Sequence, residues 1–262
     1  MSKKAHIVAL ANQKGGVGKT TTALNLAVGL SQFKRRVLLV DIDPQGNCTT
    51  GIGVELAPGQ LTTAEVLTDE ASIGQARVRA ETANVDIVPG NQDLTSAEVG
   101  LIEREERSNY LREALMMVED EYDDILIDCP PALNVLTLNA LTAADAVLIP
   151  MQCEYYALEG LSALVDTIEQ IQSSVNPRLQ IEGLVRTMYD MRNNLSGAVS
   201  RQLQENFGDK LYRTIIPRNV RVAESPSYGE SVLTYDPESR GAIAYRGLAG
   251  EYINRRRQQG HY

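Results

Sequence analysis

The chain has 262 residues, of which 43% are hydrophobic and 23% charged, and its formal net charge is −9. No apolar run approaches the roughly 18 residues of a membrane span, and no cleavable leader precedes the first apolar run. The cysteines Cys48, Cys129 and Cys153 are odd in number and scattered, which argues against a disulfide framework. The acidic balance argues against nucleic-acid binding over the whole surface but allows a local basic face. We therefore expect a folded cytosolic protein.

A glycine-rich stretch, residues 13–22, lies between an apolar run at 6–11 and a segment with helical apolar spacing at 23–30. Strand, glycine loop and helix in this order form the context of a phosphate-binding loop. Its three glycines let backbone N–H groups turn toward one point, where the helix N-terminus adds partial positive charge. Lys19 would supply a full positive charge for the β- and γ-phosphates, and Thr20 a hydroxyl for magnesium.

The match to the G-x-x-x-x-G-K-[ST] pattern is incomplete. Gln13 stands where the first glycine is expected, and the loop contains an additional lysine, Lys14. A chance glycine-rich turn is the alternative interpretation, and the flanking strand and helix argue against it.

Further along the chain, apolar runs alternate with segments of helical periodicity. The pattern predicts strands at 36–40, 85–90, 125–131, 146–150 and 181–188, and helices at 61–69, 108–121, 160–173 and 240–255. Such alternation is typical of a doubly wound, mostly parallel sheet with helices on both faces, an α/β fold. Neither a repeat nor a linker interrupts it, so we expect a single domain over residues 1–262.

Aspartates follow two of the predicted strands. Asp41 and Asp43 follow the strand at 36–40, and Asp128 lies near the end of the strand at 125–131. Because ligands bind at the carboxyl ends of parallel strands, these carboxylates should lie near Lys19. Asp128 has the Walker B form and would hold magnesium directly or through water. Asp41 and Asp43 could instead be turn residues. The acidic run at 119–124 is expected to be a solvated loop.

Five motifs then carry a family resemblance. They are residues 14–20, 40–47, 127–131, 152–160 and 216–221. In these motifs the chain resembles the ParA/Soj branch of the ParA/MinD ATPases, which have a deviant Walker A loop, and the resemblance covers nearly the whole chain. It implies an ATP- and Mg²⁺-dependent homodimer that binds DNA non-specifically in chromosome or plasmid partitioning. It also implies slow ATP hydrolysis stimulated by a ParB-type partner, and a cytoplasmic protein associated with the nucleoid, not with a membrane.

The resemblance also implies roles for individual residues. Lys14 looks like the signature lysine that reaches the nucleotide of the opposite subunit, and Asp43 looks like the residue that positions the attacking water. The catalytic set is then Lys14, Lys19 and Asp43, and the magnesium set is Thr20, Asp41 and Asp128. The nucleotide contacts are Lys14, Gly15, Gly16, Val17, Gly18, Lys19, Thr20, Thr21 and, in the adenine pocket, Pro217 and Asn219. The DNA contacts are Arg192 and Arg221.

The charge distribution is consistent with a local DNA-binding face. Residues 180–222 contain seven basic and four acidic side chains, a net charge of +3, so the rest of the chain carries −12. A basic segment in an acidic protein fits a phosphate-binding face, although scattered solvated arginines would give the same count.

Other functional classes remain open at this point. A MinD-like membrane ATPase would need a C-terminal amphipathic helix, and residues 253–262 are basic without an apolar stripe. An iron–sulfur ATPase would bind its cluster through Cys129 and Cys153, which are better explained as buried core residues. An ATPase that positions a protein cargo on the nucleoid could keep every motif named above. A binding module without hydrolysis would lack Lys19 or Asp43.

Overall fold

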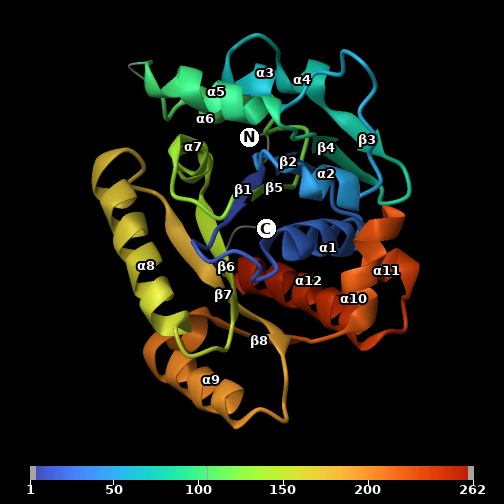
Figure 1. The fold of residues 1–262 in the computed structure, drawn as a ribbon, viewed down its shortest axis with the longest axis vertical. Coiled ribbons are helices and arrows are strands. Elements are labelled where there is room, and N and C mark those ends of the chain that lie inside the picture. The colour runs from blue at the N-terminus through green and yellow to red at the C-terminus, as the bar shows by residue number, and fades with distance from the viewer. Residues whose placement is uncertain (1–3, 105, 259–262) are drawn as a thin grey trace.

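The computed structural model of the protein describes residues 4–104 and 106–258, and one eight-stranded sheet runs through it (Figure 1). The strand order is β3-β4-β2-β5-β1-β6-β7-β8, and all pairs are parallel except β3 with β4. The strands are β1 (His6–Leu10), β2 (Val37–Asp41), β3 (Val78–Ala80), β4 (Val85–Val88), β5 (Asp124–Asp128), β6 (Ala146–Gln152), β7 (Gln180–Tyr189) and β8 (Leu211–Pro217). The predicted doubly wound α/β fold is confirmed.

Helices cover both faces of this sheet. They are α1 (Lys19–Gln32), α2 (Asn47–Gly51), α3 (Thr63–Leu67), α4 (Ile73–Ala76), α5 (Asp93–Ile102), α6 (Tyr110–Met116), α7 (Val135–Ala143), α8 (Ala157–Ser174), α9 (Asn194–Phe207), α10 (Val220–Glu224), α11 (Val232–Tyr235) and α12 (Arg240–Gln258), with short 3₁₀ helices η1 (Gly208–Lys210) and η2 (Ser225–Tyr228). Within the described residues, no helix is long and apolar enough to cross a bilayer.

The strands are apolar on both sides because each side of the sheet carries a core. In β1, Val8 and Leu10 join the core that includes residues of α1 and α12, whereas Ile7 and Ala9 join the core under α3 and α5–α9. α1 and α12 pack side by side on the first face (Figure 1). This two-sided burial explains why apolar runs without polar alternation marked the central strands.

Several predicted elements differ from the structure in their ends. The helix predicted at 61–69 is α3, which begins after Thr62 in a capping box with Glu65. The helix predicted at 108–121 ends at Met116, and turns follow it. The pattern also missed β3, β8 and the helices α2, α4, α5, α7, α9, α10 and α11.

The acidic run at 119–124 is only partly the solvated loop that was predicted. Asp124 is fully buried at the start of β5, where its carboxylate pairs with Arg35 and accepts a 3.1 Å hydrogen bond from the Tyr252 hydroxyl. Asp124 can therefore be buried although it belongs to an acidic run, because the fold provides a cation and a hydroxyl donor for its carboxylate.

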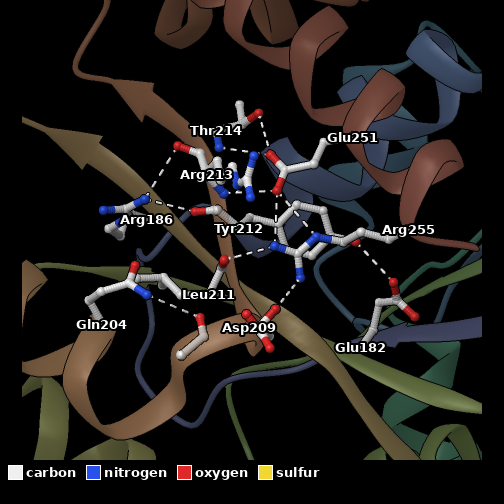
Figure 2. Close-up of polar contacts among 11 residues, drawn as sticks. Glu182, Arg186, Gln204, Asp209, Leu211, Tyr212, Arg213, Thr214, Glu251 and Arg255 are labelled. Carbon is white, nitrogen blue, oxygen red and sulfur yellow. Dashed lines mark hydrogen bonds and ion pairs between the residues drawn. The ribbon is translucent and has the colours of Figure 1, made fainter. Parts of the chain in front are cut away.

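The pairing of β7 with β8 is interrupted by a bulge. From Leu184 to Arg186 β7 advances two residues while β8 advances four, from Leu211 to Ile215. The side chain of the buried Arg186 fills this gap, donating to the Tyr212 carbonyl at 2.7 Å and to the Arg213 carbonyl at 3.3 Å (Figure 2). A bulge of this kind leaves backbone groups without ladder partners, so a side chain has to replace them.

α12 holds the other side of the same strand (Figure 2). The Glu251 carboxylate accepts hydrogen bonds from the backbone N–H groups of Arg213 and Thr214, both at 2.8 Å, and from the Thr214 hydroxyl at 2.7 Å. Arg255 donates to the carbonyls of Asp209 and Leu211 at 2.7 and 2.8 Å. Two side chains of α12 therefore supply partners for backbone groups in the first half of β8 and just before it.

Candidate nucleotide-binding site

The glycine-rich loop connects β1 to α1, and its shape depends on left-handed glycines. Gly16 has φ 71° and Gly18 has φ 83°, backbone conformations that residues other than glycine rarely adopt. Gly18 is also the N-cap of α1, so the first turn of that helix opens at the loop. The loop forms part of the wall of a cavity of 560 Å³, which also contains Lys19, Thr20 and Asp43. The cavity thus lies at a helix N-terminus, a position suited to anions.

Side chains from β6 and β7 fix the loop. The Thr187 hydroxyl donates to the Val17 carbonyl at 2.7 Å, and Gln152 Nε2 donates to the Gly16 carbonyl at 3.0 Å. Asn12 accepts from the Lys14 N–H at 3.0 Å and donates to the Pro150 carbonyl at 2.9 Å. The loop is therefore held in one shape by the neighbouring strands.

Lys19 is buried at the base of the loop. Its ammonium group lies 3.4 Å from the Lys14 carbonyl oxygen, and burial lowers its pKa although Asp128 and Asp43 favour the charged form. A buried cation needs compensation by negative charge. Lys19 is thus poised to accept an anion in the cavity.

Asp41 is oriented by α2 at the carboxyl end of β2. Its Oδ2 atom accepts from the Thr49 N–H at 2.9 Å and from the Thr49 hydroxyl at 2.8 Å, and its Oδ1 atom accepts from the Asp43 N–H at 3.2 Å. Complete burial raises the pKa of Asp41 to about 6, although these three donors act in the opposite direction. Asp41 is therefore rigid and already hydrogen-bonded.

Asp128, at the end of β5, is fully buried but, in contrast to Asp41, has few hydrogen-bond donors around it. Within the described residues, neither of its carboxylate oxygens has a partner at full hydrogen-bonding geometry, although Thr20 approaches closely enough to favour the ionised form. Burial raises the pKa of Asp128 well above its usual range, and the charges of Asp41 and Asp43 add to this, while Lys19 opposes it. An unsatisfied buried carboxylate is costly unless a ligand completes it.

These residues fit a magnesium ion of the kind that binds together with phosphates. In the part of the chain described, no group of three or more His, Cys, Asp or Glu side chains could enclose a metal ion. Mg²⁺ commonly uses one or two carboxylates together with waters and phosphate oxygens. The bare carboxylate of Asp128 and the hydroxyl of Thr20 satisfy that requirement, with Asp41 next to them.

Lys14 is on the outside of the site. Its side chain is 45% exposed and its ammonium group lies 2.5 Å from Oε2 of Glu154, itself 47% exposed. In contrast to Lys19, Lys14 therefore presents its charge toward solvent, where another molecule can reach it. Most of the predicted loop residues line the cavity together with Asp43, whereas Lys14, Val17, Asp41 and Asp128 do not.

The structure places the remaining predicted residues elsewhere. Pro217 ends β8, and Asn219 caps α10 by accepting from the Val222 N–H at 3.3 Å; neither is among the residues lining the cavity. Sequence reasoning did not identify three other residues at the loop, Gln152, Thr187 and Met188. Gln152 entered only as the first residue of the motif at 152–160, without a role of its own, and Thr187 and Met188 lie at a strand end that carries no motif.

The two predicted DNA contacts are exposed but already paired. Arg192 is 90% exposed and its guanidinium group contacts the carboxylate of Asp190 at 2.9 and 3.0 Å. Arg221 is 52% exposed and lies 3.0 Å from Glu224 and 3.3 Å from Asp236. Of the basic segment at 180–222, Arg186 is buried in the bulge and belongs to the fold.

Comparisons with known proteins agree with this geometry. A family model described as an AAA domain matches residues 5–181. The chain is 51% identical to the chromosome partitioning protein ParA of Caulobacter vibrioides (strain NA1000 / CB15N), across 97% of this chain and 96% of the relative. It is 49% identical to the sporulation initiation inhibitor protein Soj of Bacillus subtilis (strain 168), across 94% of this chain and 97% of the relative.

A solved structure extends the likeness to three dimensions. The cobyrinic acid a,c-diamide synthase from Mycobacterium smegmatis, with a bound ATP analogue and magnesium, has a TM-score of 0.84 and 37% identity, covering 98% of this chain and 97% of that one. Its overall fold therefore matches from end to end, including the region of the glycine loop. With about half of its residues shared with partitioning proteins over nearly its full length, the chain belongs to the ParA/Soj family of P-loop ATPases.

Proposed function

We propose that this chain is a Mg²⁺-dependent ATPase that dimerises with ATP, binds DNA without sequence preference and acts in chromosome or plasmid partitioning. A ParB-type partner would stimulate its hydrolysis, and DNA binding would associate it with the nucleoid in the cytoplasm. We propose that the whole chain acts as one ATPase domain, since a single sheet takes strands from His6 to Pro217.

The observation that carries the proposal is the state of Asp128. Its buried carboxylate oxygens have no partner at full hydrogen-bonding geometry in the described chain, although Thr20 approaches them, and the buried Lys19 lies close enough to favour their charge. A structural aspartate would be hydrogen-bonded, as Asp41 is. A magnesium ion bound with the phosphates of ATP would complete it. The likeness to a solved protein containing an ATP analogue and magnesium supports this choice of ligand.

Each residue has a distinct task in this proposal. The loop N–H groups and Lys19 would bind the phosphates, and Thr20 and Asp128 would hold the ion, with Asp41 at its side. Magnesium would neutralise charge on the phosphate oxygens when bound. Asp43, which lines the cavity, would orient the attacking water.

Lys14 would act on the nucleotide of the second copy. Its exposed ammonium group is paired with Glu154 outside the cavity lining, and it would leave Glu154 to reach phosphates across the dimer interface. A lysine donated in trans makes hydrolysis conditional on dimerisation, as an arginine finger does. Slow turnover follows, since each cycle requires assembly of two subunits.

Arg192 and Arg221 would contact DNA phosphates. Each is exposed, and each would have to exchange its carboxylate neighbours for a phosphate. Exposed ion pairs contribute little to stability because solvent screens them, so a phosphate can replace these carboxylates as the partner of each guanidinium group. The adenine contacts of Pro217 and Asn219 stay a prediction, and would require the nucleotide to reach beyond the cavity toward the end of β8.

ATP hydrolysis by an Asp43→Ala variant tests the proposal. It should bind ATP and dimerise but hydrolyse roughly a hundredfold more slowly or worse, because the water loses its orienting group. Asp166→Ala, on the exposed side of α8, is the matched control and should keep the wild-type rate. Wild-type hydrolysis by Asp43→Ala would refute the role of Asp43, and a wild-type chain without Mg²⁺-dependent ATP hydrolysis would refute the proposed function.

Two related functions make different predictions. A MinD-like membrane ATPase would bind anionic vesicles in the presence of ATP, and would do so without DNA. An ATPase that positions a protein cargo would bind DNA equally well, but a centromere-binding protein would not stimulate it. Vesicle sedimentation and partner-stimulated hydrolysis separate the three.

A further inference from the structure

A strained residue stands at the end of β7, next to the glycine loop. Met188 has φ 47°, in the left-handed region that residues other than glycine and asparagine rarely occupy. The pairing shifts at the same point, since β7 advances three residues from Arg186 to Tyr189 while β8 advances two, from Ile215 to Pro217. The extra residue is a second bulge, and bulges beside ligand sites redirect a side chain.

The bulge directs the Met188 side chain into the candidate site. Met188 lines the 560 Å³ cavity, and its methyl group lies 3.7 Å from the point where a side chain on Gly18 would begin. Its sulfur is 2.7 Å from Gln152 Nε2, the same group that donates to the Gly16 carbonyl. The preceding residue, Thr187, binds the loop through Val17. Met188 is therefore held against the loop from two directions.

The cavity needs an apolar wall as well as a phosphate end. Its lining combines the loop and Lys19 with the apolar side chains of Leu24, Pro131, Met188 and Pro226. Among these, Met188 borders Gly18, the residue immediately before Lys19. A thioether is polarisable and packs well against an aromatic base. Strained backbone persists where the surrounding structure requires it, commonly at ligand sites.

We propose that Met188 contacts the nucleoside part of the bound nucleotide, and that its left-handed backbone is retained because it places the thioether there. This inference rests on the proposed function, since it assumes that the cavity takes a nucleotide. It assigns the recognition of the base and sugar to the end of β7, in addition to the predicted contacts of Pro217 and Asn219.

The test uses Met188→Asn, because asparagine tolerates a left-handed backbone but does not provide the apolar surface. Relief of strain should raise the thermal midpoint of the free protein by about 2–4 °C. Affinity for ADP with Mg²⁺ should fall by roughly tenfold, as expected when an apolar contact is lost. Affinity for inorganic tripolyphosphate, which has phosphates but no nucleoside, should not change. A purely structural residue would not show these opposite effects together.

Two controls complete the experiment. Met191→Asn changes a methionine three residues away that is 90% exposed, and it should alter neither affinity. Met188→Leu keeps an apolar side chain and should restore most of the ADP affinity. ADP binding by Met188→Asn equal to that of the wild type, or an equal loss of tripolyphosphate binding, would overturn the inference. A wild-type protein that binds neither ATP nor ADP would instead overturn the proposed function, and this inference with it.

Discussion

Replacing Arg186 by methionine should destabilise the fold markedly, although Arg186 lies outside the proposed ligand site. This side chain fills the bulge between β7 and β8, and it donates to Ser200 at 2.8 Å, to Tyr212 at 2.7 Å and to Arg213 at 3.3 Å. Methionine keeps the length of the aliphatic stem but supplies no donor. The carbonyls of Tyr212 and Arg213 would then face a gap in the sheet without a partner.

The size of the effect follows from those two carbonyls. A buried acceptor without a partner costs about 1–3 kcal/mol, so two cost about 2–6 kcal/mol. Arg186 is 8% exposed and, within the described chain, has no ion pair with an acidic side chain. Removing such a buried charge offsets part of the loss. We expect a net loss of about 2–4 kcal/mol, or a thermal midpoint lower by roughly 5–15 °C.

Chemical denaturation, monitored by circular dichroism, measures this loss directly. Arg201→Met is the matched control, because Arg201 is exposed on α9 next to Ser200 and should unfold within about 0.5 kcal/mol of the wild type. If Arg186→Met and Arg201→Met unfold at the same denaturant concentration, the guanidinium group is not what holds the bulge, and the reasoning is wrong.

Three further predictions concern the site, the DNA face and pH. Lys14→Gln should bind ATP through Lys19 but lose the ATP-dependent dimer; an unchanged dimer in gel filtration would contradict its role in trans. Arg192→Glu and Arg221→Glu should each abolish ATP-dependent DNA binding but not dimerisation, and a neutral substitution should flatten the log–log salt slope by roughly two units per dimer; unchanged slopes would place the face elsewhere. Burial lowers the pKa of His6, but two neighbouring carboxylates raise it overall, so the charged imidazole stabilises the fold below pH 6.5 and this stability is lost as pH rises through the folded pKa. The free energy of unfolding of His6→Gln, measured from pH 6 to 8, should not show this decrease. A pH profile like that of the wild type would refute the role of His6.

This pH effect could not be predicted from the sequence, because the groups that surround His6 come from distant parts of the chain. His6 lies 3.4 Å from Asp145 and 3.6 Å from Glu182, and Arg256 approaches the same buried group. The four residues come from the amino-terminal ends of three strands and from the last helix. No spacing in the sequence brings them together, since the register of a parallel sheet does so.

The parts that the sequence predicted well are those that depend on local pattern. The glycine loop needs left-handed residues at fixed offsets, and the central strands need apolar side chains on both faces. Asp41 and Asp128 are paired neighbours in the register of β2 and β5, so a strand-end rule was enough to place them together. The loop and each strand end are encoded in a short stretch of the chain, and the parallel register brings the two strand ends together.

The parts that it missed depend on contacts between distant residues. β8 lacks the apolar run of a central strand, since it contains Arg213 and Thr214. Side chains of β7 and α12 form the hydrogen bonds that its backbone needs at these two residues. Asp124 is buried in an acidic run because Arg35 pairs with it. Met188 belongs to no motif, and only the structure shows its left-handed backbone and its place in the cavity wall. Side chains that replace a missing backbone or charge partner leave no periodic signal.

The contacts of Glu251 and Arg255 along β8 have a consequence for how copies of this chain can meet. The outermost strand of an open sheet presents free donors and acceptors that invite a strand from another molecule, which leads to aggregation. Here the carboxylate already binds the N–H groups of Arg213 and Thr214, and the guanidinium group binds the carbonyls of Asp209 and Leu211 (Figure 2). A foreign strand would have to displace two helix-anchored side chains before it gained a hydrogen bond there. A high concentration of copies therefore does not turn this part of the edge into a template for polymerisation.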